Sequence, residues 1–329
     1  MNRAARATVV AACIAALTLL LLALGLAIGS TGLEPLRVGT GDPVAWQIVW
    51  DIRLPRTLGA WLAGMLLGLG GALAQGLFRN PLADPYLLGS ASGASLGVAL
   101  LLVLLGIAPA AGTLGARLGM TGAAFVGAVL AVLLTLGLAR GVQQTLRLLL
   151  AGVVVGMVLG AASSLVMLWV PEIMRAMQAF MLGSTAFLGW PAVAVMAGAL
   201  LLSLLPGLVL ARALDALTLG EASAVSLGLP LAWVRAALIA ALALSTGAAV
   251  AQVGLVAFIG LVSPHLVRAL VKATHGALVL LASLMGGLLL LAADVLARWL
   301  LAPQELPVGV LTALLGGGYL LWLMNRGGR

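Results

Sequence analysis

Few residues of this chain carry groups that could do chemistry, and the acidic ones are the rarest. Only nine of the 329 residues are Asp or Glu, and Asp294 is the clearest case of one inside a long apolar run. An ionisable group within a membrane usually marks a proton or ion pathway. Arg298 follows Asp294 by four residues, however, and such a spacing on a helix is also that of a local ion pair. Both interpretations stay open, and the spacing favours the ion pair.

Three arginines form a second group. Arg53 and Arg56 precede one apolar run and Arg298 ends another. If those runs cross a membrane, all three residues fall on the same side of it. Guanidinium groups at a water-facing rim suit the carboxylates of an external protein. The alternative is that their long side chains only extend to the membrane interface.

The composition excludes several kinds of catalytic centre. The one cysteine, Cys13, lies in an apolar run, and there are only two histidines, His265 and His275. The single lysine, Lys272, is followed by alanine, so no phosphate-binding loop ending in Lys-Ser or Lys-Thr is present. No group of residues fits a nucleophile, base or metal cluster. We therefore expect no enzyme and no bound cofactor, and any ATP used must be hydrolysed by another chain.

The balance of residue types indicates a membrane protein. Hydrophobic residues make up 63% of the chain, charged residues 8%, and the mean hydropathy is +1.23. Too little polar material is present to cover a surface in water, so most exposed side chains must face a lipid bilayer. The net charge of +8 does not indicate nucleic acid as a partner, because no basic cluster accompanies it.

We predict ten spanning helices from the apolar runs between charges and prolines. A helix needs about 20 apolar residues to cross the hydrocarbon of a bilayer. The predicted spans are 7–29, 57–77, 87–106, 118–138, 148–169, 191–211, 234–254, 256–271, 277–297 and 307–324. The eighth is short and interrupted by Pro264. The expected fold is an all-α polytopic membrane protein in which residues 1–329 form a single domain.

Basic residues orient these spans. Ten spans place both termini on one side, which then carries eleven of the 17 Lys and Arg residues against six on the other. Cytoplasmic loops hold the excess of positive charge in membrane proteins. We therefore predict that both termini are cytoplasmic.

Two sequence patterns concern the packing of the helices. Glycines recur every fourth residue in three runs, as in Gly64 and Gly68, and small residues at this spacing let helices approach closely. The stretch Gly71-Ala-Leu-Ala-Gln75 also resembles Gly247-Ala-Ala-Val-Ala-Gln252, in a span of opposite direction. This similarity indicates either an inverted repeat of five plus five spans, a common transporter plan, or chance in Ala/Gly/Leu-rich sequence.

Two cytoplasmic segments have turn or helix signals. Residues 79–90 contain Pro81 and Pro85, which restrict their predecessors and predict a structured turn. Such a turn is either a plain connector or a gate at a pore mouth. Residues 212–235 predict a short amphipathic helix ended by Gly228 and Pro230, which lies against another protein or only along the interface.

Motifs spread from the second to the last predicted span resemble those of a known family. They are Arg53-Leu-Pro-Arg56-Thr-Leu, the stretch Gln75 to Gly89, Leu149-Leu-Ala-Gly-Val, Gly220-Glu-Ala with Leu227-Gly-Leu-Pro, Phe258-Ile-Gly-Leu-Val-Ser-Pro-His265-Leu-Val-Arg268, Ala293-Asp-Val-Leu-Ala-Arg298 and Glu305-Leu-Pro-Val-Gly. In order and type, these motifs are similar to those of the membrane-spanning subunit of binding-protein-dependent ABC importers for ferric siderophores, haem and cobalamin.

The resemblance implies partners and a place for each. It implies ten spans per subunit in a bacterial inner membrane, a second copy of the chain around a central pore, two ATPase subunits below and a periplasmic binding protein above. Arg53, Arg56 and Arg298 match the family arginines that receive acidic residues of the binding protein. The segment that matches the family's ATPase-coupling helices contains Gly220, Glu221, Ala222, Ser223, Leu227 and Gly228.

The resemblance also implies a gate at the cytoplasmic end of the pore. Asn80 with Leu82, and the turn formed by Gln143, Gln144 and Thr145, match the family positions that close it. The coupling segment departs from the pattern of many ABC importers. It reads Glu221-Ala-Ser with Gly228 seven residues after the glutamate, where those importers have Glu-Ala-Ala and glycine six residues on. Individual ATPase contacts therefore cannot be copied onto it.

The cargo is less well indicated. Histidine can ligate haem iron, but both histidines fall at the cytoplasmic end and match positions usual in relatives with other cargo. A path on the outer side is a better indication, because Arg175 suits a propionate while Met177 and Met181 offer soft apolar surface. We expect haem rather than a ferric siderophore. The alternatives are cobalamin, carried by the same kind of permease, and a secondary transporter driven by an ion gradient.

Overall fold

The computed structural model describes residues 3–29, 32–33, 43–105, 114–139 and 145–327, and almost all of its elements are helices. The elements in chain order are α1 (Arg3–Ala27), β1 (Ile28–Gly29), β2 (Gly32–Leu33), α2 (Pro43–Ile48), η1 (Val49–Arg53), α3 (Leu54–Phe78), η2 (Pro85–Leu88), α4 (Ser90–Leu105), α5 (Leu114–Leu138), α6 (Thr145–Trp169), η3 (Pro171–Ile173), α7 (Met174–Leu182), α8 (Trp190–Val209), α9 (Ala211–Thr218), α10 (Glu221–Ser226), α11 (Leu231–Val253), α12 (Ile259–Leu270), α13 (His275–Trp299) and α14 (Val308–Gly327). The two short strands pair antiparallel just after α1.

The predicted spans are confirmed as helices. They correspond, in order, to α1, α3, α4, α5, α6, α8, α11, α12, α13 and α14. Within the described residues, seven spanning candidates are long and apolar enough to cross a membrane, while α4, α12 and the apolar part of α14 are shorter. The protein is therefore an all-helical, multi-pass membrane protein. The helices α2, α7, α9 and α10 lie between spans and are too short for hydropathy to reveal.

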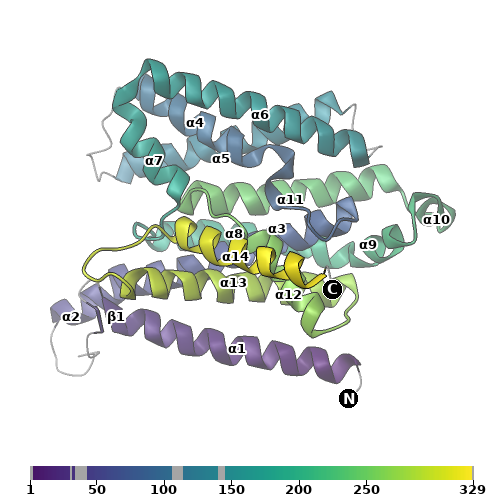
Figure 1. Ribbon diagram of the computed structural model, residues 1–329, viewed down its shortest axis with the longest axis horizontal. Helices are drawn as coiled ribbons and strands as arrows, with labels where there is room; N and C mark the ends of the chain where they lie inside the picture. The colour runs from purple at the N-terminus through teal and green to yellow at the C-terminus, as the bar shows by residue number, and fades with distance from the viewer. Residues whose placement is uncertain (1–2, 30–31, 34–42, 106–113, 140–144, 328–329) are drawn as a thin grey trace.

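The two ends of the bundle are distinct. Figure 1 shows α2 and α7 at one end, called the outer end below, and α9 and α10 at the other, called the inner end. The first helix begins, and the last helix ends, at the inner end (Figure 1). The described chain thus begins and ends at the same end of the bundle, as an even number of spans requires.

The helix α3 is the centre of the fold. Every residue from 62 to 78 is buried, and α3 packs against α13, α11, α12 and α8. Figure 1 shows α4 to α7 on one side of this core and α1 on the other. The neighbouring helices α3 and α11, which carry the two similar stretches, run in opposite directions, as an inverted repeat requires. The repeat itself stays a prediction.

Glycine lets α3 and α13 pack backbone to backbone. A Cβ atom on Gly64 would collide with the carbonyl of Gly286, and one on Gly68 with that of Ala282. The same close approach joins Gly93 of α4 to the carbonyl of Gly127 on α5. The predicted packing role of the four-residue glycine spacing is therefore confirmed for these pairs.

Pro264 lies inside α12 instead of interrupting it. A proline in a helix leaves the carbonyl four residues earlier without its usual amide partner. Here that carbonyl belongs to Gly260, and Gly71 of α3 lies so close to it that a Cβ would overlap the oxygen. Because Gly71 has no side chain, α3 can pack directly against this carbonyl, and α12 continues through Pro264.

A leucine at Gly68 is expected to destabilise the fold, because the side chain would meet the backbone of α13. Overpacking of this kind costs about 1–3 kcal/mol or more. The matched control is Gly137→Leu in α5, because no atom lies within 4 Å of a Cβ placed there. Thermal unfolding in detergent should show a lower midpoint for Gly68→Leu and little change for the control. Equal midpoints for the two variants would contradict this account of the α3–α13 contact.

Candidate functional site

The outer end brings together the three predicted arginines. Arg53 ends η1, Arg56 lies in the first turn of α3, and Arg298 lies in the last turn of α13. Pro55 lies in the first turn of α3, which directly follows the π-helical residues of η1, and the two residues before it are already helical. The close packing of α3 on α13 then places Arg56 and Arg298 around one carboxylate, that of Asp294.

Asp294 is the centre of a buried polar cluster. Its side chain is 0% exposed, and Oδ2 accepts a hydrogen bond from Arg298 Nη2 at 2.6 Å. Its Oδ1 accepts from Thr185 Oγ1 at 2.6 Å and from Nε and Nη2 of Arg56, both at 3.3 Å. A buried charge is tolerated when it is paired and hydrogen-bonded in this way. The cluster thus has the features of a structural ion pair, as the spacing of Asp294 and Arg298 indicated.

Arg298 does not lie at a water-facing rim, so that expectation is wrong. Its side chain is only 2% exposed. Besides Asp294, its Nη1 donates to the carbonyl oxygens of Gly25 at 2.9 Å and Ile28 at 3.3 Å. The last carbonyls of a helix lack helical partners, and a cation there also suits the helix dipole. Arg298 therefore fastens the end of α1 to α13.

Arg56 and Arg53 are the members of the group that reach the surface. Arg53 is partly exposed and donates from Nη1 to the carbonyl of Leu26 at 3.0 Å. Arg56 is 11% exposed, and its Nη1 lies 2.9 Å from Oε1 of Glu305, which is 28% exposed. A carboxylate of this chain thus already pairs with one of the nitrogen atoms of the Arg56 guanidinium. Glu305 and Thr185 were not predicted as members of this group, because the sequence places them far from Arg56.

At the inner end, the predicted coupling segment contains two helices instead of one. The first is α9, and the second is α10, which is flanked by Gly220 and Gly228. Both glycines have positive φ, +107° and +79°, and a Cβ added to either would meet nothing within 4 Å. Backbone conformation, not crowding, therefore favours glycine at both positions. Of the other predicted residues, Ala222 and Leu227 are exposed and Ser223 is partly exposed.

Two ion pairs and the hydrogen bonds of a histidine join the predicted coupling segment to three spanning helices. Glu221, the first residue of α10, lies 2.5 Å from Nη2 of Arg235 in α11 and 3.7 Å from Nη2 of Arg79 at the end of α3. Asp215 of α9 accepts a hydrogen bond from the backbone amide of His275 at 3.0 Å and lies 2.7 Å from its Nδ1. His275 begins α13. A displacement of α9 and α10 would therefore act directly on α3, α11 and α13.

The turn after α3 carries Asn80 and Leu82 at the surface. Asn80 Oδ1 accepts a hydrogen bond from the Leu82 amide at 2.9 Å, and the Leu82 side chain is 58% exposed. Asp84 begins η2 by accepting from the Tyr86 amide at 2.8 Å. Burial raises the pKa of the Asp84 carboxyl, and this hydrogen bond opposes the rise in part. The predicted structured turn is present; Gln143 and Gln144 lie outside the described residues.

The predicted substrate path is only partly exposed. Arg175 and Met181 of α7 are exposed, with 47% exposure for Met181. Met177 is 0% exposed and packs with Ala94, Val98 and Val250 in a core cluster. The expectation that Met177 lines a path is therefore wrong, because α7 turns that residue toward α4. His265 contacts the ring of Tyr319 at the inner end, and no metal-binding group of His, Cys, Asp and Glu is present in the described part of the chain.

Comparisons with known proteins give a consistent result. The FecCD transport family matches residues 17–326. Over 318 residues, 94% of each chain, the protein is 40% identical to the hemin transport system permease protein HmuU of Yersinia pestis. Over 325 residues, 96% of this chain and 95% of the other, it is 39% identical to the vitamin B12 import system permease protein BtuC of Escherichia coli O157:H7. A solved inward-facing structure of a metal-chelate type ABC transporter is similar with a TM-score of 0.84 and 29% identity, covering 95% of this chain and 97% of that one.

Proposed function

Because the chain belongs to the FecCD transport family, it is a permease subunit of an ABC importer. We propose that its outer arginines bind a periplasmic binding protein and that its α9–α10 segment binds an ATPase subunit. We also propose that its cargo is haem. The subunit is not itself catalytic, and the ATPase is a separate chain.

One observation carries the proposal: the same two helices connect the outer arginines with the coupling segment. At the outer end, α3 contributes Arg56 and α13 contributes Asp294. At the inner end, Arg79 follows α3 and His275 begins α13, and these residues contact Glu221 and Asp215 of the coupling segment. Because α3 and α13 pack backbone to backbone, a force applied to α9 and α10 would reach the outer arginines without a flexible connection.

The binding protein would meet Arg53 and Arg56, while Arg298 positions them. Arg298 is buried, but it holds the Asp294 carboxylate against which Arg56 lies. An acidic residue of the binding protein could contact the exposed part of Arg56 by displacing Glu305. Charge-assisted pairs of arginine with carboxylate give such docking both orientation and strength.

A second copy of the chain and a cytoplasmic gate complete the proposal. Within one chain α6 exposes long aliphatic side chains, such as Met157 at 71% and Val158 at 60%, which lipid or a second copy must cover. The exposed turn with Asn80 and Leu82 lies at the inner end, where it would close the pore. The excess of basic residues at that end supports an orientation in which it lies, with both termini, on the cytoplasmic side of a bacterial inner membrane.

Haem is proposed as the cargo on the basis of the outer helix α7. Its exposed Arg175 suits a propionate group, and exposed Met181 offers polarizable apolar surface nearby. A ferric siderophore or cobalamin would gain less from an isolated guanidinium. The two named relatives, with 40% and 39% identity, do not separate these cargoes.

The cargo is tested with the whole transporter in liposomes, assembled with its ATPase subunits and its binding protein. We expect uptake of haem and little uptake of cyanocobalamin or of a ferric siderophore. Arg175→Gln should lower haem uptake about tenfold, and Arg147→Gln, an exposed arginine at the inner end, should not. Preferred uptake of cobalamin would overturn the cargo but not the permease assignment. Uptake by this chain alone on an ion gradient would contradict the mechanism.

A further inference from the structure

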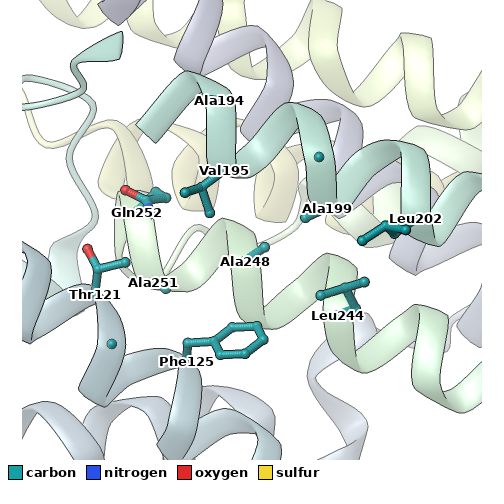
Figure 2. Close-up of a pocket in the computed structure, with 12 residues that line it drawn as sticks. Thr121, Phe125, Ala194, Val195, Ala199, Leu202, Leu244, Ala248, Ala251 and Gln252 are labelled. Atoms are coloured by element: carbon teal, nitrogen blue, oxygen red, sulfur yellow. The ribbon is translucent and has the colours of Figure 1, made fainter. Parts of the chain in front are cut away.

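A groove of about 420 Å³ lies between α5 and α8 and extends from the middle of the bundle toward its outer end. Figure 2 shows α8 on one side of it, α5 on the other, and α11 behind. Both α5 and α8 pack on α11. The lining is almost entirely aliphatic or aromatic, including Phe125, Val195 and Leu202. Its size falls within the range of ligand sites, which hold about 300–1,000 Å³.

Small residues keep this groove open. Gly122 of α5 and Gly198 of α8 line it, and a Cβ added to either would have no atom within 4 Å. Ala248 and Ala251 form its floor on α11. These glycines differ from Gly64 and Gly68, where the backbone of a neighbouring helix occupies the space that a side chain would take. The space at Gly122 and Gly198 is therefore available to a molecule that the protein does not supply.

The two helices that flank the groove have exposed aliphatic surface. Leu202, which lines the groove on α8, is 66% exposed, and α5 exposes Val126 at 55% and Leu130 at 59%. Both helices are long and apolar enough to span a bilayer. Water entering the groove would find few polar partners, so hydrocarbon is the expected content.

The outer end of the groove has a different character. Gln252 lies in the last turn of α11 and Thr121 in the outer third of α5, and Figure 2 shows both at the same end, opposite Leu202 and Leu244. Neither side chain makes a hydrogen bond to another residue that the structure describes. Gln75, the counterpart of Gln252 in the similar stretch of α3, has both a donor bond to the Leu261 carbonyl at 3.1 Å and an acceptor bond from Arg268.

We propose that this groove binds one acyl chain of a membrane phospholipid, with the Gln252 amide and the Thr121 hydroxyl donating hydrogen bonds to the ester oxygens of that lipid. Such a molecule has the two parts that the groove offers, a long apolar chain and polar acceptors at one end. No charged side chain lines the groove, so an anionic chelate would lack a partner there. The bound chain would support α8, which leads directly into α9, the first helix of the proposed coupling segment.

The test compares two glycine-to-leucine variants. Gly198→Leu would fill the groove from α8 without backbone collision, whereas Gly137→Leu places the same side chain at an equally open position of α5 outside the groove. The transporter is reconstituted in nanodiscs with phosphatidylethanolamine that carries a photoreactive diazirine at the middle of one acyl chain. Peptide mapping then locates the labelled residues.

In the unchanged protein we expect labelling of the groove residues of α5, α8 and α11. Gly198→Leu should reduce that labelling about tenfold, and Gly137→Leu should leave it unchanged. Thermal stability in detergent should rise on addition of the phospholipid, and this rise should be smaller for Gly198→Leu and for Gln252→Leu than for Gly137→Leu. Gln252→Leu and Gly137→Leu both add a hydrophobic side chain, but only Gln252→Leu removes the polar contact, so their comparison separates the two effects.

Equal labelling of the groove in Gly198→Leu and the unchanged protein would overturn the proposal. So would loss of the dimer in Gly198→Leu with lipid labelling retained, because the groove would then seat a second copy. Haem that competes with the photoreactive lipid would identify the groove as part of the cargo path instead. None of these outcomes depends on whether the outer arginines dock a binding protein.

Discussion

Replacing Arg56 by glutamine is expected to abolish most of the stimulation of ATP hydrolysis by the periplasmic binding protein. Glutamine can still donate a hydrogen bond to Asp294, so the buried cluster retains a partner at that position. The positive charge offered to an acidic docking residue is lost, however. Removal of one partner from a partly buried charge pair costs about 2–5 kcal/mol, which corresponds to a fall in affinity of at least tenfold.

The measurement is ATPase activity of the assembled transporter in nanodiscs as a function of binding-protein concentration. Glu305→Gln is the matched control, since it removes the other half of the 2.9 Å pair and leaves Arg56 in place. We expect this variant to need the same or a lower concentration of binding protein, because a docking carboxylate no longer competes with Glu305. Normal stimulation of Arg56→Gln would refute the docking role.

The choice of substitutions follows from burial. Charge reversal at Arg298 would place a second carboxylate beside Asp294, which is 0% exposed, and would remove the donors to the end of α1. Breaking a buried pair in this way costs about 3–5 kcal/mol. A variant with both Arg56 and Arg298 reversed would therefore test folding and not docking.

The sequence was sufficient to predict the spans, the outer arginines and Asp294, but not the contacts of these residues with Thr185 and Glu305 or the burial of Arg298. Long apolar runs indicate helices because a bilayer requires internally bonded backbone of a fixed length. The burial of Met177 and the exposure of Met181 could not be predicted, because α7 contacts its neighbours along only part of its length. The burial of Arg298 depends on the end of α1, which lies about 270 residues away in the chain.

Prediction from the sequence has the same limit at the inner end of the bundle. Gly228 and Pro230 correctly indicated where a helix ends, but α9 was not predicted as a separate helix. The contacts of Glu221 with Arg235 and Arg79 also depend on how α10 lies across the ends of α11 and α3. No spacing in the sequence indicates such contacts between helices. They are nevertheless the contacts on which the proposed mechanical role of the segment depends.

Replacing Ala224 by proline is expected to uncouple ATP hydrolysis from transport. The Ala224 amide donates to the Gly220 carbonyl at 3.0 Å within α10, and its side chain is 0% exposed. Proline removes that hydrogen bond, and its ring collides with the preceding turn, at a cost of about 3 kcal/mol or more. A helix as short as α10 cannot compensate for such a loss. The ATPase subunits should then fail to co-purify, or should hydrolyse ATP without uptake of cargo.

Proline at Glu221 separates helix disruption from the loss of ion pairs. Glu221 is the first residue of α10, where proline is well tolerated, and the ψ of +156° at Gly220 suits a following proline. Glu221→Pro should therefore behave like Glu221→Gln, which loses the same charge but keeps the backbone amide. If α10 transmits force as a helix, Ala224→Pro loses coupling while these two variants retain most of it. Normal transport by Ala224→Pro would show that α10 does not carry the motion, and equal loss in all three variants would assign it to the ion pairs of Glu221.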